Sequence, residues 1–358
     1  MPKIPQSARP STWNIDFLHR TPSMDGPLDI AFRHALRRAA SSLTRLRPRL
    51  PILIYHRVLE DPDPMRPEAM DAALFARQIA FIASSFRILP LSEAIGLLED
   101  GRLPPRALSI TVDDGYEECA TLMLPILQSY GVTATFFVAT GPLDGEPIWN
   151  DRIIEALRVA PDESLDLRDH GLADYDLSGV AQRAKSARQL IERLKRLPAW
   201  TRRKVVEEIT ARVPQDAMPR MLSREQIRTL YQAAMGIGSH TRTRPILTRI
   251  PPEDAQREIQ AGKRTLEEII GAEVDLFAYP NGDYTMEHIE MARQLGIRAA
   301  VSTFPGAAAP DTDRYQLPRF TPWDTQTAKF GLRLLWNQFA PVKCRQAAQP
   351  PVVHLGPQ

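Results

Sequence analysis

Short apolar runs alternate along this chain with longer segments in which apolar residues recur at helical spacing. Runs that are apolar on both faces are typical of parallel strands buried beneath helices. The sequence predicts about eight such strands, among them 51–56, 107–112, 133–138, 235–240, 274–279, 297–301 and 315–320. Strands that alternate with helices predict an α/β architecture with a parallel sheet, and a barrel is its most economical form.

Several of the intervening helices carry boundary signals. Pro252 and Gly271 mark the two ends of one helix, because proline favours the first turn and glycine the position after the last. Thr285 is expected to cap the helix that follows it, and Ser92 to cap the helix Glu93–Asp100. These residues define the helical segments more closely than apolar spacing alone.

Residues 145–222 interrupt the alternation of strands and helices. They contain a charged loop region and two basic helices, near 181–197 and 201–213. Asn150 or Asp151 most simply caps the helix that follows them, and a substrate role is the minority interpretation. We expect a mainly helical insertion near the mouth of the barrel, forming a solvated cover and not a second core.

The insertion leaves one predicted barrel domain over 49–325. An N-terminal extension occupies 1–48, and a C-terminal helix and tail occupy 326–358. In the extension, residues 28–47 form a basic amphipathic helix. Such a helix most often packs against the outside of a domain. The alternative is peripheral contact with an anionic membrane surface.

Composition excludes some functional classes. Lys and Arg number 45 and Asp and Glu 43, so the net charge of +2 gives no argument for nucleic-acid binding. The two cysteines, Cys119 and Cys344, lack the spacing of a disulfide framework or metal motif. We find neither an apolar stretch long enough to span a membrane nor a secretory signal, which predicts a cytoplasmic location.

Polar residues cluster at the ends of the predicted strands. Asp113 and Asp114 follow the central strand, His240 follows another, and Tyr279-Pro280-Asn281 a third; His56 ends the first strand. An isolated Asp-Asp-Gly is more often an ordinary turn, and a lone histidine an ordinary polar group. However, the carboxyl ends of parallel strands meet at one edge. Carboxylates and imidazole converging there are typical of a divalent-metal hydrolase site.

Five segments together resemble the successive motifs of polysaccharide deacetylases with a NodB-homology domain. They read LPILIYHRV, TVDDG, MGIGSHT, FAYPNGDY and YQLPR, and the resemblance extends from Leu50 to Asp324 outside the insertion. It implies a distorted (β/α) barrel and hydrolysis of N-acetyl groups on an amino-sugar glycan. A chitooligosaccharide or an exopolysaccharide intermediate would be a plausible carbohydrate substrate.

The resemblance also implies roles for individual residues. Asp113 matches the general base, while Asp114 and His240 match ligands of a divalent metal ion, Zn²⁺ in particular. Tyr279 and Pro280, with Asn281 beside them, match the segment whose backbone N–H helps to hold the oxyanion. The implied mechanism is metal-assisted attack of water on the acetamide.

The sequence departs from the family pattern at a metal ligand. Arg244 stands where the family has its second histidine, and a guanidinium has no lone pair to donate. No arginine precedes the FAYP segment, and no C-terminal Leu-x-His motif is present. Arg244 could turn outward or pair with Asp114 or Asp113. Arg319 in YQLPR is a further candidate site residue.

Two interpretations follow. One is an active hydrolase with an altered metal site, in which His56 or water replaces the missing ligand. The other is a metal-free member that binds a glycan or partner without hydrolysing it. The presence of Asp113, Asp114 and His240 favours the first, because two adjacent buried carboxylates need a compensating cation.

Overall fold

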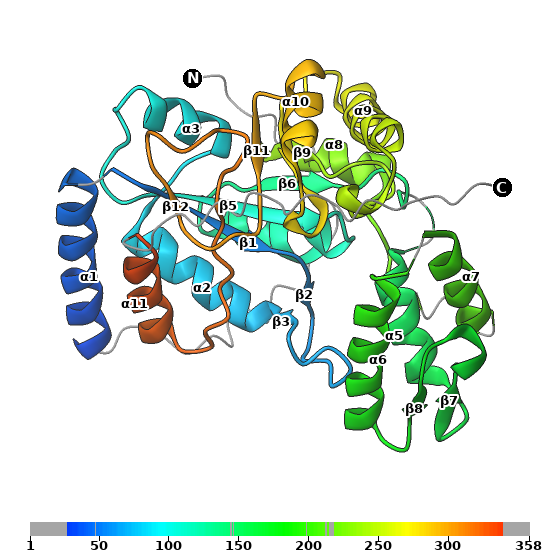
Figure 1. Cartoon of the computed structure of the whole chain (residues 1–358). Helices are drawn as coiled ribbons and strands as arrows, with labels where there is room; N and C mark the ends of the chain where they lie inside the picture. The colour runs from blue at the N-terminus through cyan, green and yellow to red at the C-terminus, as the bar shows by residue number, and fades with distance from the viewer. Residues whose placement is uncertain are drawn as a thin grey trace.

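A curled sheet of eight strands forms the centre of the chain in a computed structural model (Figure 1). The structure describes residues 27–46, 48–143, 145, 147–197, 199–211, 213–214 and 218–338. The strands run in the order β11-β10-β9-β6-β5-β1-β12, with β4 beside the start of β5. All neighbours are parallel except β1 and β12. Their bounds are β1 Leu50–Tyr55, β4 Arg87–Ile88, β5 Ala107–Asp114, β6 Thr135–Val138, β9 Gly236–Ser239, β10 Leu276–Ala278, β11 Ala299–Val301 and β12 Ala307–Ala308.

The two sides of the sheet are joined by an irregular segment. Leu317 donates to Ala300 of β11 over 3.1 Å, and Phe320 donates to Ile52 of β1 over 2.8 Å. The regular strand expected over 315–320 is therefore wrong, because only isolated bridges form there and Pro318 has no N–H to donate. The barrel is closed through these bridges, which confirms the predicted distorted (β/α) architecture.

Helices cover the outside of the barrel. Side chains alternate along each strand, so one set packs inside the barrel and the other beneath the helices. A turn of π-helix, Cys119–Met123, precedes α4. The helices are α1 Pro27–Leu46, α2 Ala72–Ser85, α3 Leu91–Glu99, α4 Leu124–Ser129, α8 Arg224–Gln232, α9 Pro252–Ile270, α10 Met286–Gln294 and α11 Thr327–Asn337.

The boundary signals were mostly reliable. The start of α9 at Pro252 and its left-handed Gly271 cap are confirmed, as is Thr285 as the N-cap of α10. The predicted Ser92 cap is wrong. Pro90 occupies the N-cap of α3, and its carbonyl already accepts from Ala94 N–H, which places Ser92 inside the first turn.

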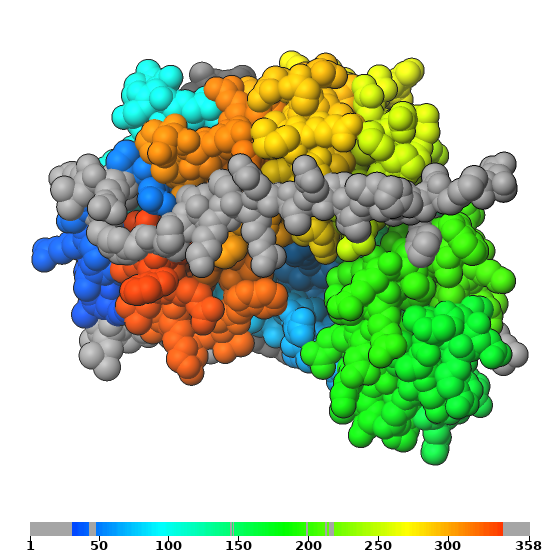
Figure 2. Space-filling model, viewed as in Figure 1, coloured from blue at the N-terminus to red at the C-terminus, as the bar shows by residue number. Residues whose placement is uncertain are grey.

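The insertion forms a lobe beside the barrel, shown in green in Figures 1 and 2. It contains α5 (Trp149–Val159), the hairpin β7–β8 (Ser164–Asp166 and Asp174–Asp176), α6 (Val180–Leu194) and α7 (Ala199–Thr210). The prediction of a solvated cover without a core is wrong. The lobe buries its own apolar cluster, because apolar side chains spaced among the charges share one face of each helix; its members include Ile153, Leu157, Leu190, Leu194 and Val205.

Helix α1 lies along α2 and α11. Its Leu36 and Ala40 are buried in the main core, while Arg37 and Arg38 stay exposed. The apolar side is thus already occupied by the domain, and membrane contact stays a prediction that concerns the basic side only. Every helix in the described part of the chain is too short or too polar to cross a bilayer. A short parallel pair, β2 (Val58–Leu59) and β3 (Met70–Asp71), follows β1.

Replacement of Gly238 by alanine should destabilise the barrel. The new Cβ would lie 2.4 Å from ring atoms of the fully buried Phe137, so strand β9 or the ring must shift. We expect a loss of about 1–3 kcal/mol in the free energy of unfolding, measured by urea denaturation. Gly96→Ala is the matched control, because no atom lies within 4 Å of its Cβ and alanine favours a helix by up to ~1 kcal/mol. Equal effects of the two substitutions would contradict this packing.

Candidate functional site

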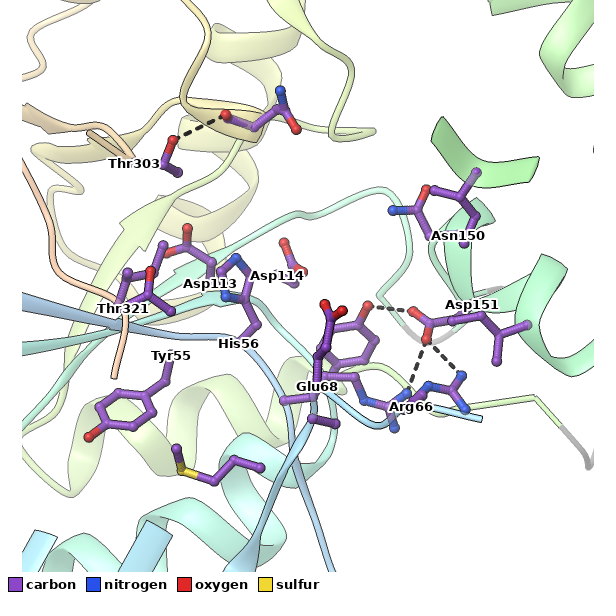
Figure 3. Close-up of a pocket in the computed structure, with 18 of the residues that line it drawn as sticks. Tyr55, His56, Arg66, Glu68, Asp113, Asp114, Asn150, Asp151, Thr303 and Thr321 are labelled. Atoms are coloured by element: carbon purple, nitrogen blue, oxygen red, sulfur yellow. Dashed lines mark hydrogen bonds and ion pairs between the residues drawn. The ribbon is translucent and has the colours of Figure 1, made fainter. Parts of the chain in front are cut away.

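The strand ends bring most of the predicted residues together at one mouth of the barrel. Asp113, Asp114, His56, His240 and Asn281 line a cavity of about 650 Å³. The cavity lies between the barrel and the insertion, and Asn150 of α5 faces Asp114 across it (Figure 3). The parallel strands therefore bring these side chains together as the sequence predicted.

The backbone around this mouth is strained. Asp114, Thr241, Arg244 and Asn281 have φ values of 84°, 66°, 57° and 61°. They are four of the six non-glycine residues with positive φ in the described chain. Such conformations cost of order 1 kcal/mol each and tend to gather at functional sites. At Asp114 the unusual φ also ends the strict alternation of β5, and its carboxylate meets side chains of the 240–244 loop.

Asp113 is held by the fully buried Arg319. The two Nη atoms donate to the two carboxylate oxygens over 2.6 and 2.7 Å. Nε donates to Ser302 carbonyl over 2.7 Å, and the guanidinium lies 5.7 Å from the centre of the Phe137 ring. This bidentate pair makes Arg319, a subsidiary candidate by sequence, the main partner of Asp113.

Asp114 is held by Arg244. The guanidinium Nε donates to Asp114 Oδ1, and the Arg244 backbone N–H is fixed by Thr241 Oγ1 at 3.0 Å. His240 Nδ1 donates to the Ala278 carbonyl over 2.8 Å, which leaves Nε2 facing Asp114 Oδ1 at 3.4 Å. Arg244 therefore points inward and pairs with Asp114, one of the two orientations that the sequence allowed.

These contacts set the ionisation of the carboxyl groups. Burial alone raises the pKa of Asp113, but Arg319 and then His240 reverse this and leave it below its usual value. Burial likewise opposes ionisation of Asp114, and Arg244 followed by His240 lowers its pKa well below the usual range. Burial lowers the pKa of His56 despite the two carboxylates nearby, so its imidazole is neutral near pH 7.

The arrangement does not fit the metal ion that the resemblance implies. Asp114 and His240 supply two candidate ligands, but Arg244, at the position where the resemblance implies a further ligand, donates to Asp114. Among the described residues, no group of three or more His, Cys, Asp or Glu side chains is placed to hold a metal ion. Histidine at position 56 lines the cavity without completing such a group.

The predicted oxyanion segment contributes less than expected. Tyr279 N–H already donates to Val301 carbonyl, and Pro280 has no N–H. The Tyr279 ring is buried and stacks on Tyr284 with 4.4 Å between ring centres. Of the three residues only Asn281 reaches the main cavity. Within this segment the Tyr279 N–H is therefore not available to an oxyanion, because the sheet occupies that donor.

Sequence reasoning missed a cluster of ion pairs that ties the insertion to the barrel. Arg66 contacts Asp151 at 2.8 Å and Glu155 at 2.6 Å, and Arg57 contacts Asp151 at 3.1 Å. Tyr116, next to the Asp pair, donates its hydroxyl to Asp151. The expected capping by residue 150 or 151 is wrong, since both lie inside the first turn of α5. The alternating charges gave no signal for these pairings between distant segments.

Comparisons with known proteins agree with this architecture. The sequence model of the polysaccharide deacetylase family matches residues 100–300, more than half of the chain. The chain belongs to the polysaccharide deacetylase family.

One curated relative, from Bacillus subtilis (strain 168), bears the name "Putative polysaccharide deacetylase YxkH". It is 31% identical over 98 residues, which are 27% of this chain and 35% of that protein. The chain thus aligns with about a third of the length of the curated relative that it matches.

Two solved structures share the fold. The Streptococcus pyogenes deacetylase PplD, in complex with acetate, has a TM-score of 0.56 and 18% identity, covering 81% of this chain and 99% of that one. IcaB from Ammonifex degensii has a TM-score of 0.52 and 18% identity, covering 79% and 97%. These matches show that the family fold extends over most of the chain.

Loss of the Arg319 guanidinium should destabilise the protein strongly. Arg319→Met leaves Asp113 buried without its cation, and we expect a loss of about 3–5 kcal/mol in the free energy of unfolding. Arg264→Met is the control, because Arg264 pairs with Glu268 on the exposed surface and should change stability by less than ~1 kcal/mol. Equal losses in urea denaturation would contradict the structural role of Arg319.

The cost of Arg319→Met should also depend on pH. In the wild type the pKa of Asp113 is lower in the folded state than in the unfolded state. The ionised Asp113 therefore stabilises the fold at pH values above its pKa in the unfolded state, and this contribution is lost as the pH falls. In the variant, burial without the cation raises that pKa, and the penalty is relieved as acid protonates Asp113. The stability difference between the two proteins should therefore be smaller at pH 4 than at pH 8. A constant difference would contradict the assignment.

Proposed function

We propose that this chain binds an N-acetylated amino-sugar oligo- or polysaccharide in the cleft between barrel and insertion, and does not hydrolyse it while Arg244 holds Asp114. Family membership supports the class of substrate. The observation that carries the proposal is the inward Arg244–Asp114 ion pair, which occupies the third ligand position.

The cleft suits a carbohydrate. Its volume of about 650 Å³ falls within the ~300–1,000 Å³ common for ligand sites. Polar side chains such as Asn150, Asn281 and Thr303 line its walls, and Trp323 stands at the rim with 62% of its surface exposed. An aromatic face with hydrogen-bonding groups around it provides both apolar contact and orientation for a sugar ring.

The capacity of Asp113 to act as a general base is also reduced. A general base works best when its pKa lies near the working pH. Both oxygens of Asp113 accept from Arg319, and the pKa of Asp113 is lowered. Asp113 is therefore a poor proton acceptor in this arrangement, which agrees with slow or absent hydrolysis.

A second candidate function is the hydrolase itself, removing N-acetyl groups from a chitooligosaccharide or an exopolysaccharide intermediate with Zn²⁺ or a related metal. The observation in its favour is that Asp113, Asp114 and His240 share one mouth, with the His240 ring oriented by the Ala278 carbonyl. This function would require Arg244 to leave Asp114.

Arg244→His should create the missing metal site. Imidazole supplies a lone pair where guanidinium cannot, and removal of the cation leaves Asp114 available. We expect the variant to take up Zn²⁺ and the wild type to take up little, measured by metal analysis after incubation and dialysis. Acetate release from N-acetylglucosamine oligomers should be higher in the zinc-loaded variant. Adding Asp114→Asn to the variant is the control and should abolish the uptake.

The opposite result would favour the second candidate. Stoichiometric zinc in the wild type, together with acetate release, would show that Arg244 yields to the metal. If neither protein takes up metal or releases acetate, but the wild type still binds the oligomers, the binding function stands alone. If the wild type also fails to bind the oligomers, the proposed function is overturned.

A further inference from the structure

Arg244 uses only part of its hydrogen-bonding capacity within the protein. Its Nε donates to Asp114, whereas its two Nη groups have no hydrogen-bond partner in the part of the chain that the structure describes. Neither Nη is among the buried unpaired atoms, and 17% of the side chain is exposed. Arg244 lines both the main cleft and a small adjoining cavity. Its outer end is thus open to a ligand.

The charges at the mouth are balanced. Asp113 is paired with Arg319 and Asp114 with Arg244, so each carboxylate has its own guanidinium. The other arginines that line the cleft also have acidic partners: Arg57 with Asp151 and Glu118, Arg66 with Asp151 and Glu155, and Arg188 with Glu68. This balance offers no strong attraction to an anionic or a cationic sugar. The Nη groups of Arg244 can still donate hydrogen bonds to a neutral acceptor group of a ligand.

Asn150 adds a complementary group near Arg244. It lines the same two cavities as Arg244, and its Oδ1 is buried without a hydrogen-bond partner among the described residues (Figure 3). An acetamido group carries one acceptor, the carbonyl oxygen, and one donor, the N–H. A guanidinium and a side-chain amide that line the same cavity can satisfy both.

We infer that Arg244 recognises the acetamido group of a bound amino sugar by donating from Nη to its carbonyl oxygen, and thereby selects acetylated over free-amine glycans. The inference rests on the proposed function. A free amino sugar lacks the acetyl carbonyl oxygen, and its amine, protonated at mildly acidic pH, has no lone pair to accept from the guanidinium. The same contact therefore favours the acetylated form of the glycan over the amine form.

Isothermal titration calorimetry with two tetrasaccharides tests this inference. One is the N-acetylglucosamine tetramer and the other the glucosamine tetramer, both at about pH 6. We expect the wild type to bind the acetylated form at least tenfold more tightly. Arg244→Met should weaken binding of the acetylated form roughly tenfold, since a charge-assisted hydrogen bond is lost. It should tighten binding of the amine form, because Asp114 then lacks its cation.

Two further variants keep the result interpretable. Arg264→Met removes an exposed arginine remote from the cleft and should change neither affinity. Arg244→Lys keeps a cation beside Asp114 with fewer donors, so it should still exclude the amine form while binding the acetylated form less tightly. Circular dichroism melting curves establish that each variant is folded before titration.

The outcomes separate the two proposals. Equal affinity of the wild type for both tetrasaccharides would overturn the role of Arg244 and leave glycan binding intact. An unchanged preference in a folded Arg244→Met protein would do the same. Failure of the wild type to bind either tetrasaccharide would overturn the proposed function and this inference together.

Discussion

Two adjacent carboxylates, Asp113 and Asp114, are buried at the end of one strand and must both be compensated. A buried charge without a partner costs several kcal/mol, so the surrounding structure has to deliver two cations to one place. Arg319 arrives from the segment that closes the barrel, and Arg244 from the loop after β9. Each guanidinium pairs with a different carboxylate, and this pairing offsets the repulsion between the two carboxylates. The strained backbone at positions 114 and 244 accompanies this double pairing.

A guanidinium and a divalent metal ion are both cations, but they differ in charge and in chemistry. A metal accepts lone pairs from ligands and substrate and lowers the pKa of bound water. A guanidinium can only donate hydrogen bonds, and its charge is spread over a plane. The guanidinium of Arg244 beside Asp114 therefore supplies a positive charge without the chemistry of a metal ion. A guanidinium can donate a hydrogen bond to a carbonyl oxygen, but it cannot activate water as a metal ion does.

The sequence allowed the barrel and the meeting of Asp113, Asp114 and His240 to be predicted, because strand order and strand ends follow from apolar runs and motifs. The direction of Arg244 stayed open, since it depends on backbone angles of a short loop. The bidentate pairing of Arg319 and the ion pairs of Asp151 join segments far apart in the chain, and local patterns carry no information about them. The insertion core was misjudged because its apolar residues are dispersed among many charges.

The irregular segment after β12 has a consequence for how the chain folds. It makes the last backbone bridges of the barrel and also carries Arg319 to Asp113, a pairing across 206 positions of sequence. Contacts of such long range form slowly, because a large loop of chain must be ordered first. Until the segment docks, β5 holds a carboxylate inside an apolar barrel with no cation. We therefore expect barrel closure and completion of the site to occur together and late in folding, because an unclosed barrel leaves Asp113 without its cation.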